Sequence, residues 1–182
     1  MSHGAGFTKL GEDELVRGHI FTVVKARFRG PGGDEFERHI VHHPGAVAVV
    51  PLHDDGSVTL VRQYRAALDR DLLELPAGTR DVEGEPEART AERELTEEAG
   101  LRAGTIEHLV TLHNAPGLSD EAVTVFLAQD LRGVADDRQG VEEEAMTVER
   151  IALSEALAMV DDGRITDAKT IIGLTLTERR LR

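Results

Sequence analysis

The stretch RELTEEAGL, residues 93–101, places three glutamates on a segment that the surrounding sequence predicts to be one helix over residues 86–99. Glu94, Glu97 and Glu98 are spaced i, i+3 and i+4, so a helix with 3.6 residues per turn brings them close together. The apolar stripe of the same helix, which must pack on a sheet, consists of Ala88, Ala91, Leu95 and Ala99. Glu94 and Glu98 border this stripe, so negative charge is crowded at the edge of the core.

The crowded glutamates have two explanations. A helix face open to solvent tolerates acidic side chains, and this is the ordinary interpretation of such a cluster. Here, however, like charges four residues apart repel each other, and the repulsion grows where the dielectric constant falls. The acids also lie at the C-terminal end of the helix, where the helix dipole disfavours negative charge. A hard divalent cation such as Mg2+ or Mn2+, which binds carboxylate, carbonyl and water oxygens, would remove the conflict.

Length, charge and composition narrow the class of protein. The 182 residues suffice for one domain with a small appended piece. A net charge of −13, from 34 acidic against 21 basic residues, argues against a nucleic-acid groove and against anionic membranes. The sequence has no cysteine, which excludes disulfides and thiolate zinc sites. Neither a signal peptide nor an apolar run of about 20 residues is present, and these features favour a cytoplasmic protein.

Alternating and continuous apolar patterns predict strands on both sides of the acidic helix. Residues 1–14 are polar and are expected to begin loosely. Strands are expected at 19–29 and 35–43, which form an N-terminal β-hairpin, in DLLELPAG (71–78) as a strand that stops at Pro76, and at 45–52, 58–65, 106–114, 122–131 and 146–153. Helices are expected at 86–99, 153–163 and 166–181. Pro86 should start the first helix and Gly100 should end it, while Ser154 should cap the second. We therefore expect an α/β fold, namely an α/β/α sandwich with a mixed β-sheet and the N-terminal hairpin.

A longer pattern around the acidic helix resembles the Nudix box. That signature is a glycine, a glutamate and, after seven further residues, a run of the form R-E-apolar-x-E-E-x-G-apolar. Here the run extends from Arg93 to Leu101 and follows Glu85 by seven residues. Six residues separate Gly78 from Glu85 where the usual pattern has five, which lengthens the loop by one residue and leaves the helix unchanged.

The resemblance implies a role for each residue of the box. Glu94 and Glu98 resemble the glutamates that bind the catalytic metals, and Glu97 resembles the neighbouring acid that binds or supports a metal. The backbone carbonyl of Ala77 resembles a main-chain metal ligand. Arg93 is similar to the arginine that orients Glu97 through an ion pair. The resemblance thus implies Mg2+ as cofactor, with Mn2+ as a substitute, and makes Glu97 a candidate catalytic residue as well.

Further segments resemble the ADP-ribose pyrophosphatase branch of this family. They are the loop APGLSDE, with Pro116 sixteen residues after Gly100, the strand VRQYR (61–65), ELPAG (74–78) and the N-terminal hairpin. In that branch the hairpin helps to build a homodimer. Residues 1–44 are therefore expected to form a dimerisation segment, and residues 45–182 the Nudix hydrolase domain.

The same resemblance nominates residues for substrate binding and catalysis. Arg65 resembles the arginine that contacts the phosphates, although a surface arginine is the alternative. Candidates near the terminal ribose are Ser119, Asp120 and Glu121, where an acidic turn is the alternative. In the run GVEEEAMTV (140–148), a glutamate just before a strand resembles the catalytic base. Glu143 is the first choice, Glu142 the second and Glu144 the third, against the alternative of a solvated acidic loop.

The expected function is Mg2+-dependent hydrolysis of ADP-ribose to AMP and ribose 5-phosphate. Two alternatives stay open: a pyrophosphatase for another nucleoside diphosphate sugar, such as GDP-mannose or ADP-glucose, and a non-catalytic domain that senses a nucleotide. Sensors of this kind usually lose box acids, and this sequence keeps all of them. The expected partners are the small-molecule substrate and a second copy of the chain, with no nucleic acid and no membrane. His39, His42 and His43 are expected to be structural.

Overall fold

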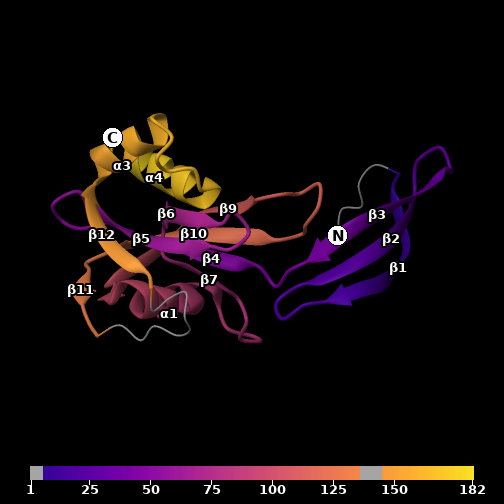
Figure 1. Ribbon diagram of the computed structural model, residues 1–182, viewed down its shortest axis with the longest axis horizontal. Coiled ribbons are helices and arrows are strands. Elements are labelled where there is room, and N and C mark those ends of the chain that lie inside the picture. Colours follow the sequence, from indigo (N-terminus) through magenta and orange to yellow (C-terminus); the bar gives the residue numbers. More distant parts are fainter. Residues whose placement is uncertain (1–5, 136–144) are drawn as a thin grey trace. The chain divides into compact units, whose positions relative to one another are not determined.

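The structure is a computed structural model, in which residues 6–135 and 145–182 are described. The chain divides into two compact units (Figure 1). The first unit contains the chain up to Gly45 together with His113–Ala122. The second contains Ala46–Leu112 and Val123–Arg182. Among the described helices, none combines the length and the apolar character that a membrane span requires.

The first unit is built on an antiparallel three-stranded sheet. Its strands are β1 (Thr8–Arg17), β2 (Thr22–Arg29) and β3 (Glu35–His42), in the order β1-β2-β3. The expected hairpin is confirmed as β2 and β3, with Arg29 opposite Glu35. The expectation of a loose start is wrong for residues 8–14, which pair with β2. Nearly every residue of β1 is exposed, so the strand needs no apolar alternation, and its polar sequence concealed it.

The strands of the second unit form a mixed sheet and two smaller sheets. They are β4 (Ala46–Pro51), β5 (Ser57–Arg65), β6 (Arg70–Glu74), β7 (Ala77–Thr79), β8 (Leu101–Arg102), β9 (Thr105–His113), β10 (Ala122–Gln129), β11 (Arg132–Gly133) and β12 (Thr147–Ala152). The sheet orders are β7-β4-β10-β9, β12-β5-β6 and β11-β8. β10 runs parallel to β4 and β7 runs antiparallel to it, which makes the central sheet mixed. The strand expected to stop at Pro76 is confirmed as β6, and Ala77 after the proline begins β7, which belongs to a different sheet.

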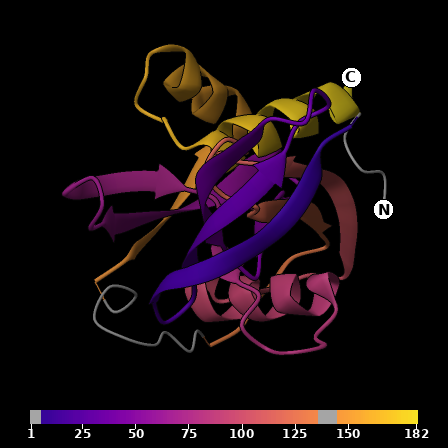
Figure 2. The same ribbon diagram turned by 90° about the vertical axis from the view of Figure 1, so that its right-hand side faces the viewer.

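Strand β4 explains why the central sheet is covered on both faces. Val47 and Val49 belong to a buried cluster with Leu95 of α1 (Glu87–Ala99). Ala48 and Val50 belong to the opposite cluster, which includes residues of α3 (Leu153–Asp161) and α4 (Ala168–Leu181). Successive strand residues point to opposite faces, so a continuous apolar run is needed here. Figures 1 and 2 show α1 on one side of this sheet and α4 on the other, which confirms the α/β/α sandwich.

The helix ends agree in part with the sequence. Gly100 ends α1 in the left-handed conformation, with φ of 62°, as expected. Pro86 is the residue before the first helical position instead of occupying it. The prediction that Ser154 caps α3 is wrong, because the helix already begins at Leu153 and Ala152 occupies the cap position. The side chain of Asp167 caps α4 by accepting a hydrogen bond of 2.9 Å from the Thr170 amide.

Candidate active site

The two glutamates that border the apolar stripe of α1 are buried. Glu94 is 7% exposed and Glu98 is 3% exposed, while Ala91 and Leu95 of the apolar stripe pack fully into the core. The helix can hold its position only by burying this stripe against β4, and the two carboxylates are carried inward with it. A buried carboxylate is costly unless it is paired or binds a metal ion, so the alternative of a solvated acidic face does not fit these two residues.

Both buried carboxylates meet the backbone at the start of β7. The Ala77 amide donates a hydrogen bond of 2.9 Å to Oε2 of Glu98. The carboxyl group of Glu94 lies over Gly78, where a Cβ atom would stand only 2.0 Å from Cδ of Glu94. β7 is held in place by pairing with β4, with Ala77 opposite Ala48. The structure therefore brings together Ala77, Glu94 and Glu98, the three residues that the resemblance to the Nudix box implied as metal ligands.

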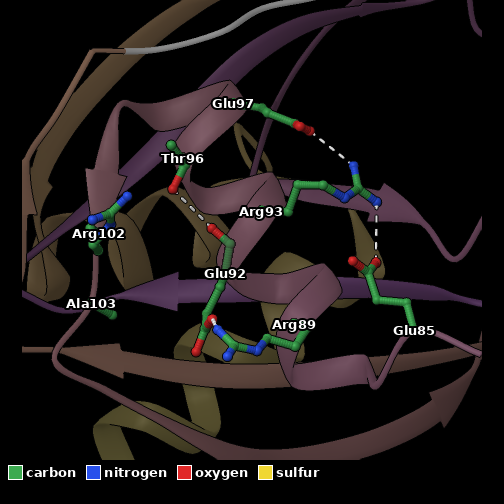
Figure 3. A pocket seen from close by; sticks show the side chains of 8 residues that line it. All are labelled: Glu85, Arg89, Glu92, Arg93, Thr96, Glu97, Arg102 and Ala103. Carbon is green, nitrogen blue, oxygen red and sulfur yellow. Dashed lines mark hydrogen bonds and ion pairs between the residues drawn. The ribbon is translucent and has the colours of Figure 1, made fainter. Parts of the chain in front are cut away.

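Arg93 forms ion pairs with the acids around it on α1 and in the loop before the helix. Its Nη1 atom lies 2.9 Å from both Glu94 and Glu97, so the expected pair with Glu97 is present (Figure 3). Its Nη2 atom lies 3.6 Å from Glu85 and 3.3 Å from Asp81. Partial burial alone would lower the pKa of Arg93, but the Glu94 and Glu97 carboxylates outweigh it and raise that pKa. This guanidinium therefore neutralises part of the charge that the box concentrates.

A cavity of about 740 Å³ lies on the outer side of the helix, next to Glu97 (Figure 3). It is lined by Glu85, Arg89, Glu92, Arg93, Thr96, Glu97, Arg102 and Ala103. Glu85, the first acid of the box, accepts a hydrogen bond of 2.9 Å from the buried hydroxyl of Thr90. The longer loop before Glu85 therefore leaves this glutamate attached to α1, beside Arg93.

The donor set near Ala77 fits a hard divalent cation. Within residues 6–135 and 145–182, no group of three or more histidine or acidic side chains forms a ready-made metal cluster. The donors are instead two buried carboxylates, Glu94 and Glu98, beside a short stretch of backbone. Mg2+ is commonly bound by one or two carboxylates, with water and substrate phosphates supplying the remaining oxygens. The arrangement suits a metal that shares its coordination sphere with a phosphate substrate.

Arg65, the predicted phosphate contact, is held by an acid that the sequence analysis did not single out. Its Nε and Nη2 atoms donate hydrogen bonds of 2.7 Å each to Glu74. Lys169 at the start of α4 also donates to Glu74. Hydrogen bonding to Glu74 raises the pKa of Arg65, and the charges of Glu98 and Asp167 add to the effect. The signal in the sequence was an acid inside the apolar run LLEL, a position where an unpaired carboxylate would be costly.

The residues predicted near the terminal ribose lie in the first unit, in the loop between β9 and β10. The Ser119 hydroxyl donates to the Val41 carbonyl over 3.0 Å. Asp120 accepts a 3.0 Å bond from the His43 amide and lies 2.5 Å from Nδ1 of His42. Glu121 accepts from the Asn114 side chain at 3.0 Å. The contacts of Ser119 and Asp120 attach the loop to β3 and to His43 just after it, whereas Glu121 bonds within the loop. The role of the three residues in substrate binding stays a prediction. The candidate bases Glu142, Glu143 and Glu144 lie outside the described residues.

We expect the attachment of this loop to β3 to weaken as the pH rises above about 6.5. Hydrogen bonds to Asp120 and then Glu12 raise the pKa of His42, so its stabilising contribution is complete below the unfolded value and is lost as the pH passes the folded value. Burial raises the pKa of Asp120, but the hydrogen bond from His42 outweighs it and the pKa falls, so this contribution persists above the unfolded value of about 3.9. Hydrogen exchange of the Val41 amide, which bonds to Leu118, measures the effect after correction for intrinsic rates.

His42→Gln should abolish this pH dependence and leave exchange uniformly faster. His39→Gln, an exposed position on the same strand, is the matched control and should behave like the unmodified protein. Equal pH dependence in the His42 variant would show that this histidine does not control the loop.

Comparison with known proteins agrees with this geometry. Residues 42–172 match the family described as the NUDIX domain. The chain is 44% identical over 168 residues to an ADP-ribose pyrophosphatase of Mycobacterium tuberculosis, across 92% of this chain and 81% of that protein. It is 36% identical over 161 residues to an ADP-ribose pyrophosphatase of Bacillus subtilis, across 88% and 86% of the two chains. A crystal structure of an ADP compounds hydrolase matches with a TM-score of 0.84 and 25% identity, over 100% of this chain and 97% of that one. The chain therefore belongs to the NUDIX family of hydrolases.

Proposed function

We propose that the protein hydrolyses the pyrophosphate bond of ADP-ribose to give AMP and ribose 5-phosphate. The observation that carries the proposal is the meeting of two buried carboxylates, Glu94 and Glu98, with the backbone at Ala77 and Gly78. This arrangement concentrates negative charge that a divalent cation would balance, and a diphosphate would supply further oxygen ligands to that cation. Similarity to two ADP-ribose pyrophosphatases over most of the chain supports the choice of substrate.

The reaction joins a water oxygen to one phosphorus atom and breaks the bond from that phosphorus to the bridging oxygen. When bound by Glu94, Glu98 and the Ala77 carbonyl, Mg2+, or Mn2+ as a substitute, would neutralise the diphosphate charge and polarise its oxygens. Glu97, oriented by Arg93, supports this charge distribution from the outer side of the helix. Glu143 is our proposed base for the attacking water, with Glu142 and Glu144 as the next choices.

For the substrate, we assign the phosphates to Arg65 and the terminal ribose to Ser119, Asp120 and Glu121. Asp120 already meets the His42 ring with one oxygen and the His43 amide with the other, so a ribose hydroxyl would have to use one of its remaining acceptor positions. Ser119 and Glu121 need smaller changes, because the hydroxyl can rotate and a carboxylate has several acceptor positions.

We also propose a cytoplasmic homodimer, with residues 1–44 as the dimerisation segment and residues 45–182 as the hydrolase domain. The support is the number of exposed apolar side chains in the first unit. Its exposed large hydrophobic side chains are Phe7, Leu10, Leu15, Val16, Ile20, Phe21 and Leu118. Exposed apolar side chains gathered in one small unit are typical of protein interaction surfaces. Light scattering at micromolar concentration should report a dimer, and a monomer would contradict this assignment.

A panel of nucleoside diphosphate sugars tests the function. Each compound is incubated with the protein, with and without Mg2+, and a phosphatase then releases phosphate from any phosphomonoester product. ADP-ribose should give the highest kcat/KM, and chelation of divalent ions should abolish the reaction. A higher kcat/KM for GDP-mannose or ADP-glucose would replace the substrate and keep the chemistry. Release from no compound would favour a non-catalytic nucleotide sensor.

A further inference from the structure

We propose that Glu74 is a positioning residue, which holds Arg65 in a fixed orientation and is itself balanced by Lys169 from the start of α4. The proposal rests on the proposed function, because it concerns how the phosphates of the substrate are met. It adds three residues of the second unit that lie outside the Nudix box, namely Glu74, Lys169 and Asp167.

Glu74 is the most deeply buried acid among the described residues, with 1% of its surface exposed. It receives three charge-assisted hydrogen bonds, two from Arg65 and one from Lys169. Burial alone would raise the pKa of Glu74, but the hydrogen bond from Arg65 and the charge of Lys169 outweigh it and lower that pKa. A carboxylate in such a place stays ionised only because both cations are present.

The pair with Glu74 determines what Arg65 offers to a ligand. Nε and Nη2 face Glu74 in the side-by-side geometry that a guanidinium and a carboxylate form, so the plane of the guanidinium is fixed. Nη1 donates no hydrogen bond to any described residue and forms no ion pair with one, and the side chain of Arg65 is 37% exposed. A phosphate can therefore reach Nη1 while Glu74 keeps the other edge. Loss of this constraint would let the long side chain sample many rotamers, and reactions that depend on orientation are sensitive to such freedom.

Lys169 ties this pair to the first turn of α4. Its Nζ atom bridges Glu74 and the helix-capping residue Asp167, which it meets at 2.9 Å. Asp167 also accepts a 2.6 Å bond from the Thr170 hydroxyl, and that hydroxyl accepts a 2.9 Å bond from the Leu75 amide. The first turn of α4 thus holds Glu74, the last residue of β6, and Leu75, which follows it. Two residues after Leu75, the Ala77 amide donates a hydrogen bond to Glu98. The first turn of α4 therefore supports the segment that carries both the partner of Arg65 and the carboxylate site.

A double-mutant cycle between Glu74→Gln and Arg65→Lys separates positioning from simple stabilisation. Glutamine keeps the shape of Glu74 and removes its charge, while lysine keeps the charge of Arg65 and cannot form the two-pronged pair. We expect Glu74→Gln to lower kcat for ADP-ribose by about 10- to 100-fold, as partners that orient a functional group typically do. In the Arg65→Lys background the same change should cost less than about threefold, since Glu74 acts through Arg65.

Glu149→Gln is the matched control, because it breaks a pair of 2.6 Å with Arg62 of β5, the strand that also carries Arg65. It should leave kcat within about twofold. If Glu74→Gln does not fold, Lys169→Met takes its place in the same cycle and should show a smaller loss that also disappears with Arg65→Lys. If the double variant lost kcat by the product of the two single losses, the positioning role would be overturned and the proposed function would stay intact. A wild-type protein that cleaves no compound of the panel would overturn both.

Discussion

Glu98→Gln is expected to reduce kcat for ADP-ribose by about 100- to 1,000-fold without loss of the fold, because the loss of a metal-binding carboxylate removes several kcal/mol of transition-state stabilisation. The glutamine keeps an oxygen that can accept the 2.9 Å bond from the Ala77 amide. It also removes one of two like charges that lie four residues apart at the edge of the core, where their repulsion is strongest. The melting temperature without metal should therefore stay the same or rise while turnover falls.

The control for this variant is Glu92→Gln, which lies on the solvent side of the same helix and pairs with Arg89. This variant should keep turnover within about twofold. Added Mg2+ should raise its melting temperature as much as it does for the unmodified protein. Calorimetry provides an independent readout, since Glu98→Gln should bind Mg2+ or Mn2+ more weakly even with a non-cleavable substrate analogue. Near-normal turnover in Glu98→Gln would remove Glu98 from the mechanism.

Gly78→Ala is expected to lower kcat by about 100-fold through displacement of Glu94. The added Cβ would stand 2.0 Å from Cδ of the Glu94 carboxyl group and little further from both of its oxygens. The carboxyl group is the far end of a flexible side chain, so it can move aside and the fold can survive. A shift of about 1 Å in a reacting constellation is enough for a loss of this size. The concentration of Mg2+ needed for half-maximal activity should rise as well, and activity titrations with metal measure both effects.

Gly133→Ala is the matched control, because its Cβ would meet nothing within 4 Å and its backbone does not require glycine. This variant should retain the activity and the metal dependence of the unmodified protein. If Gly78→Ala retained full activity at low Mg2+, the close approach of Glu94 to the backbone would have no part in catalysis.

Local periodicity allowed helix α1, which carries the glutamates of the site, to be predicted from the sequence. The spacing of Glu94, Glu97 and Glu98 fixes their positions on a helix because 3.6 residues make one turn. The ion pair of Arg93 with Glu97 follows from the same geometry, since residues four apart face each other. The continuous apolar run of β4 likewise indicated a strand covered on both faces. Strand β1 was missed because a strand that is exposed on both faces shows no apolar alternation.

The sequence by itself determined the acidic helix, its buried stripe and the sandwich that receives it, since these depend on neighbours within a few residues. Only the tertiary structure decided which distant parts of the chain the acids contact. Lys169 reaches Glu74 across 95 positions of the chain, and Asp120 reaches His42 across 78. The approach of Glu94 to Gly78 depends on how β7 pairs with β4. Contacts of this kind arise from the packing of whole elements, and no local pattern of residues encodes them.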